Sequence, residues 1–291
     1  MAVGEEEMEI HKVGVVGAGT MGNGIAQAFA TSGYDVVMRD IKQEFVDRGM
    51  STIRKSLERM AARNKISGEA KDAALARVTG AVDIAPLGDC DLIVEAALEN
   101  VDLKTKLFKE LDDVCKADAI LATNTSSISV TKIAAATKRP NKVIGMHFFN
   151  PVPVMQLIEV IRALQTDDAT CEAVLEASRK VGKTPHLVKD SYGFVVNRVL
   201  IPMINEAINC LYEGLAGPDD IDDVMKLGAN HPIGPLALAD LIGLDVTLNV
   251  METLYQGFED SKYRPSPLLK QMVDAGYLGR KSGRGFHKYE G

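Results

Sequence analysis

Short apolar runs and longer amphipathic stretches alternate along the first two thirds of this chain. The short runs are rich in Val, Ile and Leu, which is typical of strands buried on both faces of a parallel sheet. They occupy residues 13–16, 34–38, 91–96, 119–123, 142–146, 157–161 and 184–188. Between them, apolar residues recur at helical spacing over 21–32, 43–64, 67–78, 103–115, 130–137 and 172–181. This alternation predicts an α/β fold with a doubly wound, mostly parallel Rossmann-type sheet.

The pattern changes close to residue 190. Beyond this point only helical spacing remains, over 194–212, 218–226, 236–257 with an interruption at Gly243, and 268–275. We therefore expect a sheet-containing domain over residues 1–189 and a smaller all-helical domain over residues 190–291. The 194–212 helix is apolar nearly throughout, so it forms either a domain core or a dimer interface, and a core is the commoner reason for such a helix.

Composition narrows the class of protein. The chain has 291 residues, which is comfortable for two domains, and a net charge of −7, which argues against a nucleic-acid-binding surface. Its four cysteines have neither metal-ligand nor disulfide spacing, so we expect reduced thiols and no metal. No apolar run is long enough for a membrane span, and the acidic N-terminus does not resemble a signal peptide. Together these features predict a cytoplasmic protein.

A glycine-rich turn, GAGTMG, follows the first predicted strand and opens the first predicted helix. The spacing G-x-G-x-x-G is weak evidence alone, but in this context it indicates dinucleotide binding. The first glycine permits a tight turn, the second lets the backbone approach a pyrophosphate, and the third lets the helix pack on the strand. The helix N-terminus then presents N–H groups to the phosphates. The predicted cofactor-binding residues here are Gly17, Gly19, Thr20, Met21 and Gly22.

Asp40 follows the second predicted strand, eighteen residues after Gly22. A carboxylate at this place accepts hydrogen bonds from ribose hydroxyls and repels a 2′-phosphate, which favours NAD over NADP. The neighbouring Arg39 could hold such a phosphate, so the choice between the two cofactors stays open at this point.

Polar side chains follow three further predicted strands. Glu99 comes after 91–96, an Asn-Thr-Ser-Ser segment at 124–127 follows 119–123, and His147 and Asn150 follow 142–146. The carboxyl ends of parallel strands meet at one edge of a sheet, where such folds bind their ligands. We therefore predict a single polar site at this edge.

His147 is the candidate general base. Two prolines break the chain after it, and a turn near Pro153 would bring Glu159 of the next strand back beside its imidazole. A carboxylate beside an imidazole orients the ring and stabilises the imidazolium, which suits proton removal from an alcohol. The competing interpretation is a hydrogen-bonded core histidine and a glutamate on a solvated face. The position beside a nucleotide-binding fold favours catalysis.

The 43–64 helix carries a basic stripe formed by Lys55, Arg59 and Arg63. Most such stripes are solvated helix faces. The alternative is a docking surface for an anionic ligand such as a phosphorylated adenosine tail, and charge alone leaves both interpretations open.

Several motifs together resemble the 3-hydroxyacyl-CoA dehydrogenase family, and most closely its bacterial 3-hydroxybutyryl-CoA dehydrogenases. The resemblance covers nearly the whole chain in order and spacing. The motifs are GAGTMG at 17–22, VEAALEN at 94–100, NTSS at 124–127, HFFNP at 147–151, GFVVNR at 193–198, HPIGPLALADLIGLD at 231–245 and GRKSGRGFHKY at 279–289.

The resemblance implies a role for each matching residue. His147 would be the base, Glu159 its orienting partner, and Ser126 and Asn197 the residues that contact the substrate, with Ser126 also close to the cofactor. The further NAD contacts would be Glu99, Lys104, Asn150 and Lys281. Ser56 and Arg63 would contact coenzyme A. A homodimer built on the helical domain is also implied.

The implied reaction is NAD-dependent interconversion of (S)-3-hydroxyacyl-CoA, in particular 3-hydroxybutyryl-CoA, and 3-oxoacyl-CoA. One alternative is a two-domain dehydrogenase of a free 3-hydroxy acid, which would use a lysine on the first helix of the helical domain. That helix has Asn197 and no lysine. The other alternative is a nucleotide-binding module without catalytic activity, against which the set His147, Glu159, Ser126 and Asn197 argues.

Overall fold

The computed structural model describes residues 9–289, which divide into two compact units that meet between Asp190 and Ser191. Each unit has its own buried apolar core. Within the described residues, no helix is both long and apolar enough to cross a membrane.

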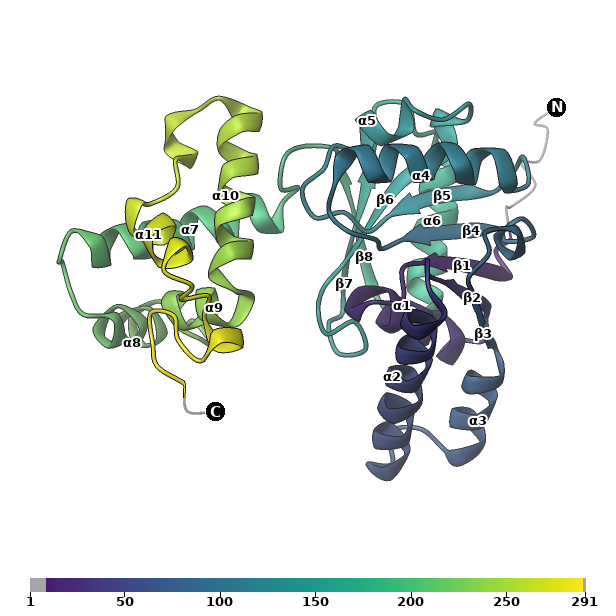
Figure 1. Cartoon of the computed structure of the whole chain (residues 1–291), viewed down its shortest axis with the longest axis horizontal. Helices are drawn as coiled ribbons and strands as arrows, with labels where there is room; N and C mark the ends of the chain where they lie inside the picture. Colours follow the sequence, from purple (N-terminus) through teal and green to yellow (C-terminus); the bar gives the residue numbers. More distant parts are fainter. Residues whose placement is uncertain (1–8, 290–291) are drawn as a thin grey trace. The chain divides into compact units, whose positions relative to one another are not determined.

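The first unit is built on an eight-stranded sheet in the described part of the chain (Figure 1). Its strand order is β3-β2-β1-β4-β5-β6-β7-β8. Neighbouring strands are parallel except at the β6–β7 pair, so β7 and β8 run opposite to the other strands. The strands are β1 (Lys12–Val16), β2 (Asp35–Arg39), β3 (Val78–Ala81), β4 (Leu92–Glu95), β5 (Ile120–Thr123), β6 (Val143–Phe148), β7 (Leu157–Arg162) and β8 (Thr184–Lys189). The predicted doubly wound, mostly parallel sheet is confirmed.

Helices cover both faces of this sheet. Helices α1 and α6 pack on one face, and α4 and α5 pack on the other, nearer to the viewer in Figure 1. Helices α2 and α3 form the crossover from β2 to β3 and extend away from the sheet side by side. The helices are α1 (Thr20–Thr31), α2 (Gln43–Ala62), α3 (Gly68–Ala76), α4 (Val101–Val114), α5 (Val130–Ala134) and α6 (Asp168–Lys180).

The structure shifts the bounds of several predicted elements and adds one strand. The predicted 67–78 helix ends at Ala76, and Val78–Ala81 forms the edge strand β3, which pairs with β2. The glycine in this strand lies directly under α2, because a Cβ on Gly80 would come within 2.5 Å of Val46 Cγ1. Helix α6 starts at Asp168, four residues before its predicted start, because the Asp167 side chain caps it by accepting a hydrogen bond from Thr170 N.

The second unit consists of helices around a core that includes Ile204, Leu236 and Met251, each fully buried. The bounds are α7 (Val196–Tyr212), α8 (Pro218–Ala229), α9 (Pro235–Ile242), α10 (Leu244–Phe258) and α11 (Pro267–Asp274). Gly243, with φ of 104°, separates α9 from α10 as the sequence predicts. Helix α7 begins two residues later than predicted, because Gly193 and Phe194 both have positive φ.

The C-terminal segment is held to this unit by two buried aspartates. Asp240 accepts hydrogen bonds from Phe286 N, His287 N and the Tyr289 hydroxyl, all at 2.9 Å. Asp222 accepts 2.8 Å bonds from Leu236 N, at the start of α9, and from His287 Nε2. The aspartates are 1% and 5% exposed, so these bonds replace water that neither carboxylate can reach.

Candidate active site

The glycine-rich turn after β1 is shaped by close backbone contacts. Gly17 has φ of +105°, and a Cβ there would lie 2.6 Å from Ala96 O, while a Cβ on Gly22 would lie 1.7 Å from Gly17 O. Both positions therefore exclude any side chain. At Gly19, by contrast, a Cβ would meet no atom of the described chain within 4 Å. The first and third glycines of the turn thus pack tightly against neighbouring backbone, whereas the middle glycine, Gly19, borders open space. The middle glycine is the one at which the backbone must approach a phosphate.

Helix α1 begins directly beyond this opening, with Gly19 as its N-cap. Among the described residues, no side chain caps this end and no acidic residue lies in its first turn. The N–H groups of the first turn and the positive end of the helix dipole are therefore available to an anion. Thr20 is exposed and Met21 is half-buried beside it. These residues fit the pyrophosphate of a dinucleotide.

Asp40 lies just past the end of β2, where the backbone holds both of its oxygens. Oδ2 accepts a 2.7 Å hydrogen bond from Ala18 N, and Oδ1 accepts one of the same length from Ile41 N. The carboxylate is thereby fixed next to the glycine-rich turn with lone pairs left for ribose hydroxyls. Arg39 instead donates through Nε to Val82 O at 3.0 Å. This arrangement fits NAD.

A buried ionic cluster lies behind the ends of β4 and β5. Lys104 of α4 is 1% exposed, and its Nζ lies 2.6 Å from Glu95 Oε1 and 3.4 Å from Glu99 Oε2. Glu95 is fully buried, and its second oxygen accepts a 2.7 Å bond from the Thr123 hydroxyl. The predicted cofactor contact Lys104 is therefore held inside the protein by two carboxylates. Through this contact Lys104 also holds Glu99.

Glu99 organises the segment that contains Ser126. Its Oε1 accepts hydrogen bonds from the backbone N–H groups of Ser126 and Ser127, at 3.0 and 3.2 Å, and from the hydroxyls of Thr125 and Ser127. Burial alone would raise the pKa of Glu99, but Lys104 and these donors lower it below its ordinary value. The ionised carboxylate thus fixes the backbone on either side of Ser126.

His147 and Glu159 are paired residues of the antiparallel strands β6 and β7. Their side chains meet with 2.8 Å between Nδ1 and Oε2, and both are buried, at 8% and 2% exposure. The prediction that Glu159 returns beside His147 is confirmed. An imidazole bonded to a carboxylate through Nδ1 has Nε2 as its second nitrogen for proton transfer.

The loop between β6 and β7 carries Asn150, which is exposed. Lys183 supports this loop by donating from Nζ to Val152 O and, at 2.8 Å, to Met155 O. Burial lowers the pKa of Lys183. Sequence reasoning did not single out Lys183, because a lone lysine before an edge strand has no distinguishing pattern. It did not single out Glu95 either. A charged residue at the end of the apolar run LIV could have indicated a buried, paired carboxylate.

Two predicted site residues belong to the helical unit. Asn197 lies in the first turn of α7. Lys281 lies in the C-terminal segment, where its Nζ contacts both carboxylate oxygens of Asp245.

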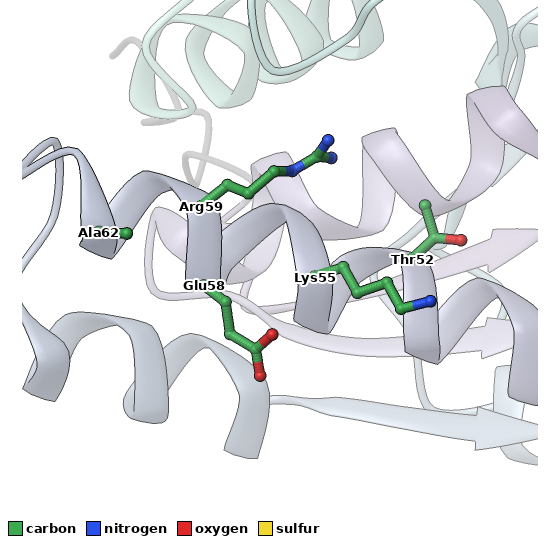
Figure 2. A pocket seen from close by; sticks show the side chains of 5 residues that line it. All are labelled: Thr52, Lys55, Glu58, Arg59 and Ala62. Carbon is green, nitrogen blue, oxygen red and sulfur yellow. The ribbon is translucent and has the colours of Figure 1, made fainter.

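Two residues of the basic stripe, Lys55 and Arg59, line a surface hollow of about 490 Å³ on α2 (Figure 2). The lining residues are Thr52, Lys55, Glu58, Arg59 and Ala62. Figure 2 shows the Arg59 and Glu58 side chains leaving the helix on different sides. The two predicted coenzyme A contacts, Ser56 and Arg63, lie on the same helix or at its end but are not among these lining residues. Ser56 is half-buried and Arg63 is exposed.

Within residues 9–289, no group of three or more His, Cys, Asp or Glu side chains is arranged to hold a metal ion. The groups that the structure places at the carboxyl edge of the sheet are the dinucleotide turn, the His147–Glu159 pair and the hydroxyl and amide groups around Ser126.

The fold and this site define a dinucleotide-binding protein of the Rossmann class with a histidine–carboxylate pair at the carboxyl edge of its sheet. Residues 12–191 match the family model for the 3-hydroxyacyl-CoA dehydrogenase NAD binding domain, and residues 193–289 match that for the 3-hydroxyacyl-CoA dehydrogenase C-terminal domain. The chain belongs to the 3-hydroxyacyl-CoA dehydrogenase family, and NAD is its cofactor.

Its relatives include two curated bacterial proteins. One, named a probable 3-hydroxybutyryl-CoA dehydrogenase of Deinococcus radiodurans, is 56% identical over 96% of this chain and 100% of its own length. The other, the 3-hydroxybutyryl-CoA dehydrogenase of Bradyrhizobium diazoefficiens, is 52% identical over 97% of this chain and 96% of its own. The crystal structure of (S)-3-hydroxybutyryl-CoA dehydrogenase from Ralstonia eutropha matches with a TM-score of 0.95 at 56% identity, covering 97% of this chain and 100% of that one.

Proposed function

We propose that this protein is an NAD-dependent 3-hydroxyacyl-CoA dehydrogenase that interconverts (S)-3-hydroxybutyryl-CoA and acetoacetyl-CoA. The observation that carries the proposal is the buried His147–Glu159 pair on β6 and β7, at the edge of the sheet where β1 ends in the dinucleotide turn. The family and the names of the relatives at 52–56% identity supply the substrate class.

His147 removes the proton of the 3-hydroxyl group in the oxidation. NAD, when bound, accepts the hydride from the same carbon. Glu159 orients the imidazole and stabilises the imidazolium that forms, because a carboxylate next to Nδ1 favours the charged ring. In the reduction of acetoacetyl-CoA, the same imidazolium returns the proton to the carbonyl oxygen.

The remaining site residues hold substrate or cofactor. Ser126 hydrogen-bonds the substrate oxygen, and Asn197 contacts the substrate. Glu99, Asn150 and Lys281 contact NAD. Lys104 acts by fixing Glu99, since its own ammonium is buried between two carboxylates.

Coenzyme A docks on the basic face of α2. Support comes from the hollow beside Lys55 and Arg59 and from the exposed Arg63 at the end of the helix. These cations suit the phosphates of the adenosine end of coenzyme A, and the guanidinium groups suit them as bidentate donors.

The protein acts as a homodimer joined through the helical unit and resides in the cytoplasm. The helical unit exposes several large apolar side chains that a partner subunit would cover. They include Val199, Leu215, Val224, Leu227 and Leu241. A cytoplasmic location fits the free thiols of Cys90, Cys115, Cys171 and Cys210.

The test is an assay of acetoacetyl-CoA reduction that follows the loss of NADH absorbance. We expect turnover with acetoacetyl-CoA and none with free acetoacetate, a substrate of the alternative class of dehydrogenase. Helix α7 contains no lysine, which that class would require. NADH binding without turnover of acetoacetyl-CoA would refute the proposed function. A series of longer acyl-CoA substrates then defines the chain-length preference.

A further inference from the structure

Strand β6 extends beyond the end of β5, the strand beside it. The register between the two strands ends at the pair Thr123–Gly145, whereas β6 continues to Phe148. His147 lies in this overhanging part of β6, next to Phe148, which is 2% exposed. A buried backbone N–H group requires an acceptor, so Phe148 needs one from outside the ladder between β5 and β6.

The side chain of Asn124 supplies this acceptor. Its Oδ1 accepts a 2.8 Å hydrogen bond from Phe148 N. An amide group that faces an N–H donor presents its oxygen, so this bond fixes the orientation of the Asn124 amide. The backbone of the same residue is bonded in the other direction, since Asn124 N donates to Glu95 O at 2.7 Å. Asn124 therefore links the ends of β4 and β6 across the end of β5.

Asn124 also begins the segment that contains Ser126. This segment is held on its other side by Glu99, whose Oε1 accepts a 3.0 Å hydrogen bond from Ser126 N. In the proposed function, Ser126 and His147 act on the same substrate oxygen, although they follow different strands. Groups that must meet one atom tolerate little displacement, since a shift of about 1 Å can lower the rate about a hundredfold. The hydrogen bond between Asn124 and Phe148 directly joins the two segments that carry these groups.

We propose that Asn124 is a positioning residue for this reaction. It holds the overhanging end of β6 to the segment after β5 and thereby sets the distance between Ser126 and His147. This inference rests on the proposed function, because it requires both residues to meet one substrate oxygen. Its consequence is that loss of the Asn124 side-chain oxygen slows the chemical step and leaves NADH binding intact.

Asn124→Leu tests the proposal, because it keeps the branched shape of the side chain and removes its acceptor. We expect kcat for acetoacetyl-CoA reduction to fall roughly thirtyfold and the dissociation constant of NADH to change by less than about twofold. Stopped-flow reduction and NADH fluorescence titration give the two values. An unchanged kcat, or a loss of NADH affinity as large as the loss of kcat, would overturn the proposal.

A double-mutant cycle with Ser126→Ala separates alignment from general damage. If Asn124 aligns Ser126 with His147, its substitution should cost only about threefold in kcat once the Ser126 hydroxyl is absent. Damage that does not involve this alignment costs the same factor in both backgrounds. Equal losses with and without the hydroxyl would therefore refute the positioning role.

Asn141→Leu is the matched control. Asn141 lies just before the opposite end of β6, and its Nδ2 donates a 2.8 Å hydrogen bond to Asp167 Oδ2. Its loss should leave kcat unchanged, since this bond lies at the amino end of the strand. A fall in kcat equal to that of Asn124→Leu would show that any damage to β6 has the same effect, which contradicts the proposal.

Amide hydrogen exchange tests the link without substrate or cofactor. In protein labelled with ¹⁵N-phenylalanine, the Phe148 N–H should exchange about tenfold faster in Asn124→Leu than in the unaltered protein. An unaltered exchange rate would show that Asn124 does not hold β6, and the inference would fail by itself. Faster exchange in a protein that never reduces acetoacetyl-CoA would refute the proposed function instead. If Asn124→Leu does not fold, the smaller and polar Asn124→Ser is measured in the same ways, with the same expected results.

Discussion

At the scale of single residues, the site depends on charges held by a few short hydrogen bonds. The imidazole of His147 is oriented by Glu159, and the backbone on either side of Ser126 is held by Glu99. In both cases a carboxylate fixes a group that contacts a ligand in the proposed function. Substitution of the contacting group should therefore change the chemistry, and substitution of the carboxylate should change geometry and pH dependence.

His147→Gln should lower kcat by about a thousandfold and leave NADH affinity within about twofold, because the base acts only in the chemical step. Stopped-flow reduction of acetoacetyl-CoA and NADH fluorescence titration give the two values. His11→Gln, at an exposed position, is the control and should retain activity. Loss of NADH binding in His147→Gln would instead indicate a structural role.

The ion pair of Glu99 should make the sheet unit sensitive to acid. Its folded-state pKa lies below the ordinary value of 4.5, so the ionised form is the one that stabilises the fold. That stability is present above pH 4.5 and is lost as the pH falls through and below this value. Thermal melts between pH 3 and 7 should show a shallower acid slope for Glu99→Gln than for the unaltered protein, and identical slopes would contradict this account.

At the scale of elements, two glycines of the turn between β1 and α1 are needed for different reasons, one for packing and the other for access of a ligand to the backbone. Gly22 is needed for packing, because its Cβ would overlap Gly17 O, whereas Gly19 borders open space. The basic stripe of α2 is the second element of the proposed function, because two of its cations, Lys55 and Arg59, line the hollow on this helix.

Gly22→Ala should destabilise the sheet unit by about 3 kcal/mol, because α1 must move away from the turn. Gly19→Ala should leave the melting temperature nearly unchanged and still weaken NADH binding, since the methyl group occupies space needed by the phosphate. Melting curves and NADH titrations of the two variants separate these effects. Unimpaired NADH binding by Gly19→Ala would show that the cofactor does not approach this glycine.

Arg59→Glu and Arg63→Glu should each raise the KM for acetoacetyl-CoA about tenfold while changing the KM for NADH little, because in the proposed docking each reverses a charge that contacts a coenzyme A phosphate. Acetoacetyl-pantetheine, which lacks the adenosine phosphates, is the control substrate. Its KM should be the same for the unaltered protein and for both variants. Equal effects on both substrates would refute docking on α2.

At the scale of the whole molecule, the chain has two cores with different architectures. The sheet unit brings together residues far apart in the sequence. In the helical unit, the segment 286–289 is hydrogen-bonded to Asp240 and Asp222. We therefore expect the stability of the helical unit to depend on these hydrogen bonds.

Asp240→Asn should destabilise the helical unit by about 2–4 kcal/mol, because an amide cannot accept from all three donors that the buried carboxylate binds. Urea unfolding followed by circular dichroism measures the change. Asp223→Asn is the control and should alter stability by less than about 0.5 kcal/mol, since its ion pair with Lys226 is exposed.

Local patterns in the sequence determined much of this protein. Strand and helix periodicity predicted the sheet, the glycine spacing with Asp40 predicted a dinucleotide site, and the prolines after His147 predicted the return of Glu159. These features depend on neighbouring residues, whose geometry is limited by backbone sterics and by side-chain period. The edge strand β3 escaped prediction because its short sequence gains strand character only from pairing with β2.

Only the tertiary structure decided which charges meet. The family resemblance implies a cofactor contact for Lys104, and the packing of α4 on the sheet brings its ammonium beside Glu95 and Glu99. Lys183 similarly acquires its role from two loop carbonyls some thirty residues earlier in the chain. The physical reason is that an ion pair depends on distance and burial, which are set by contacts between remote segments and leave no period in the sequence.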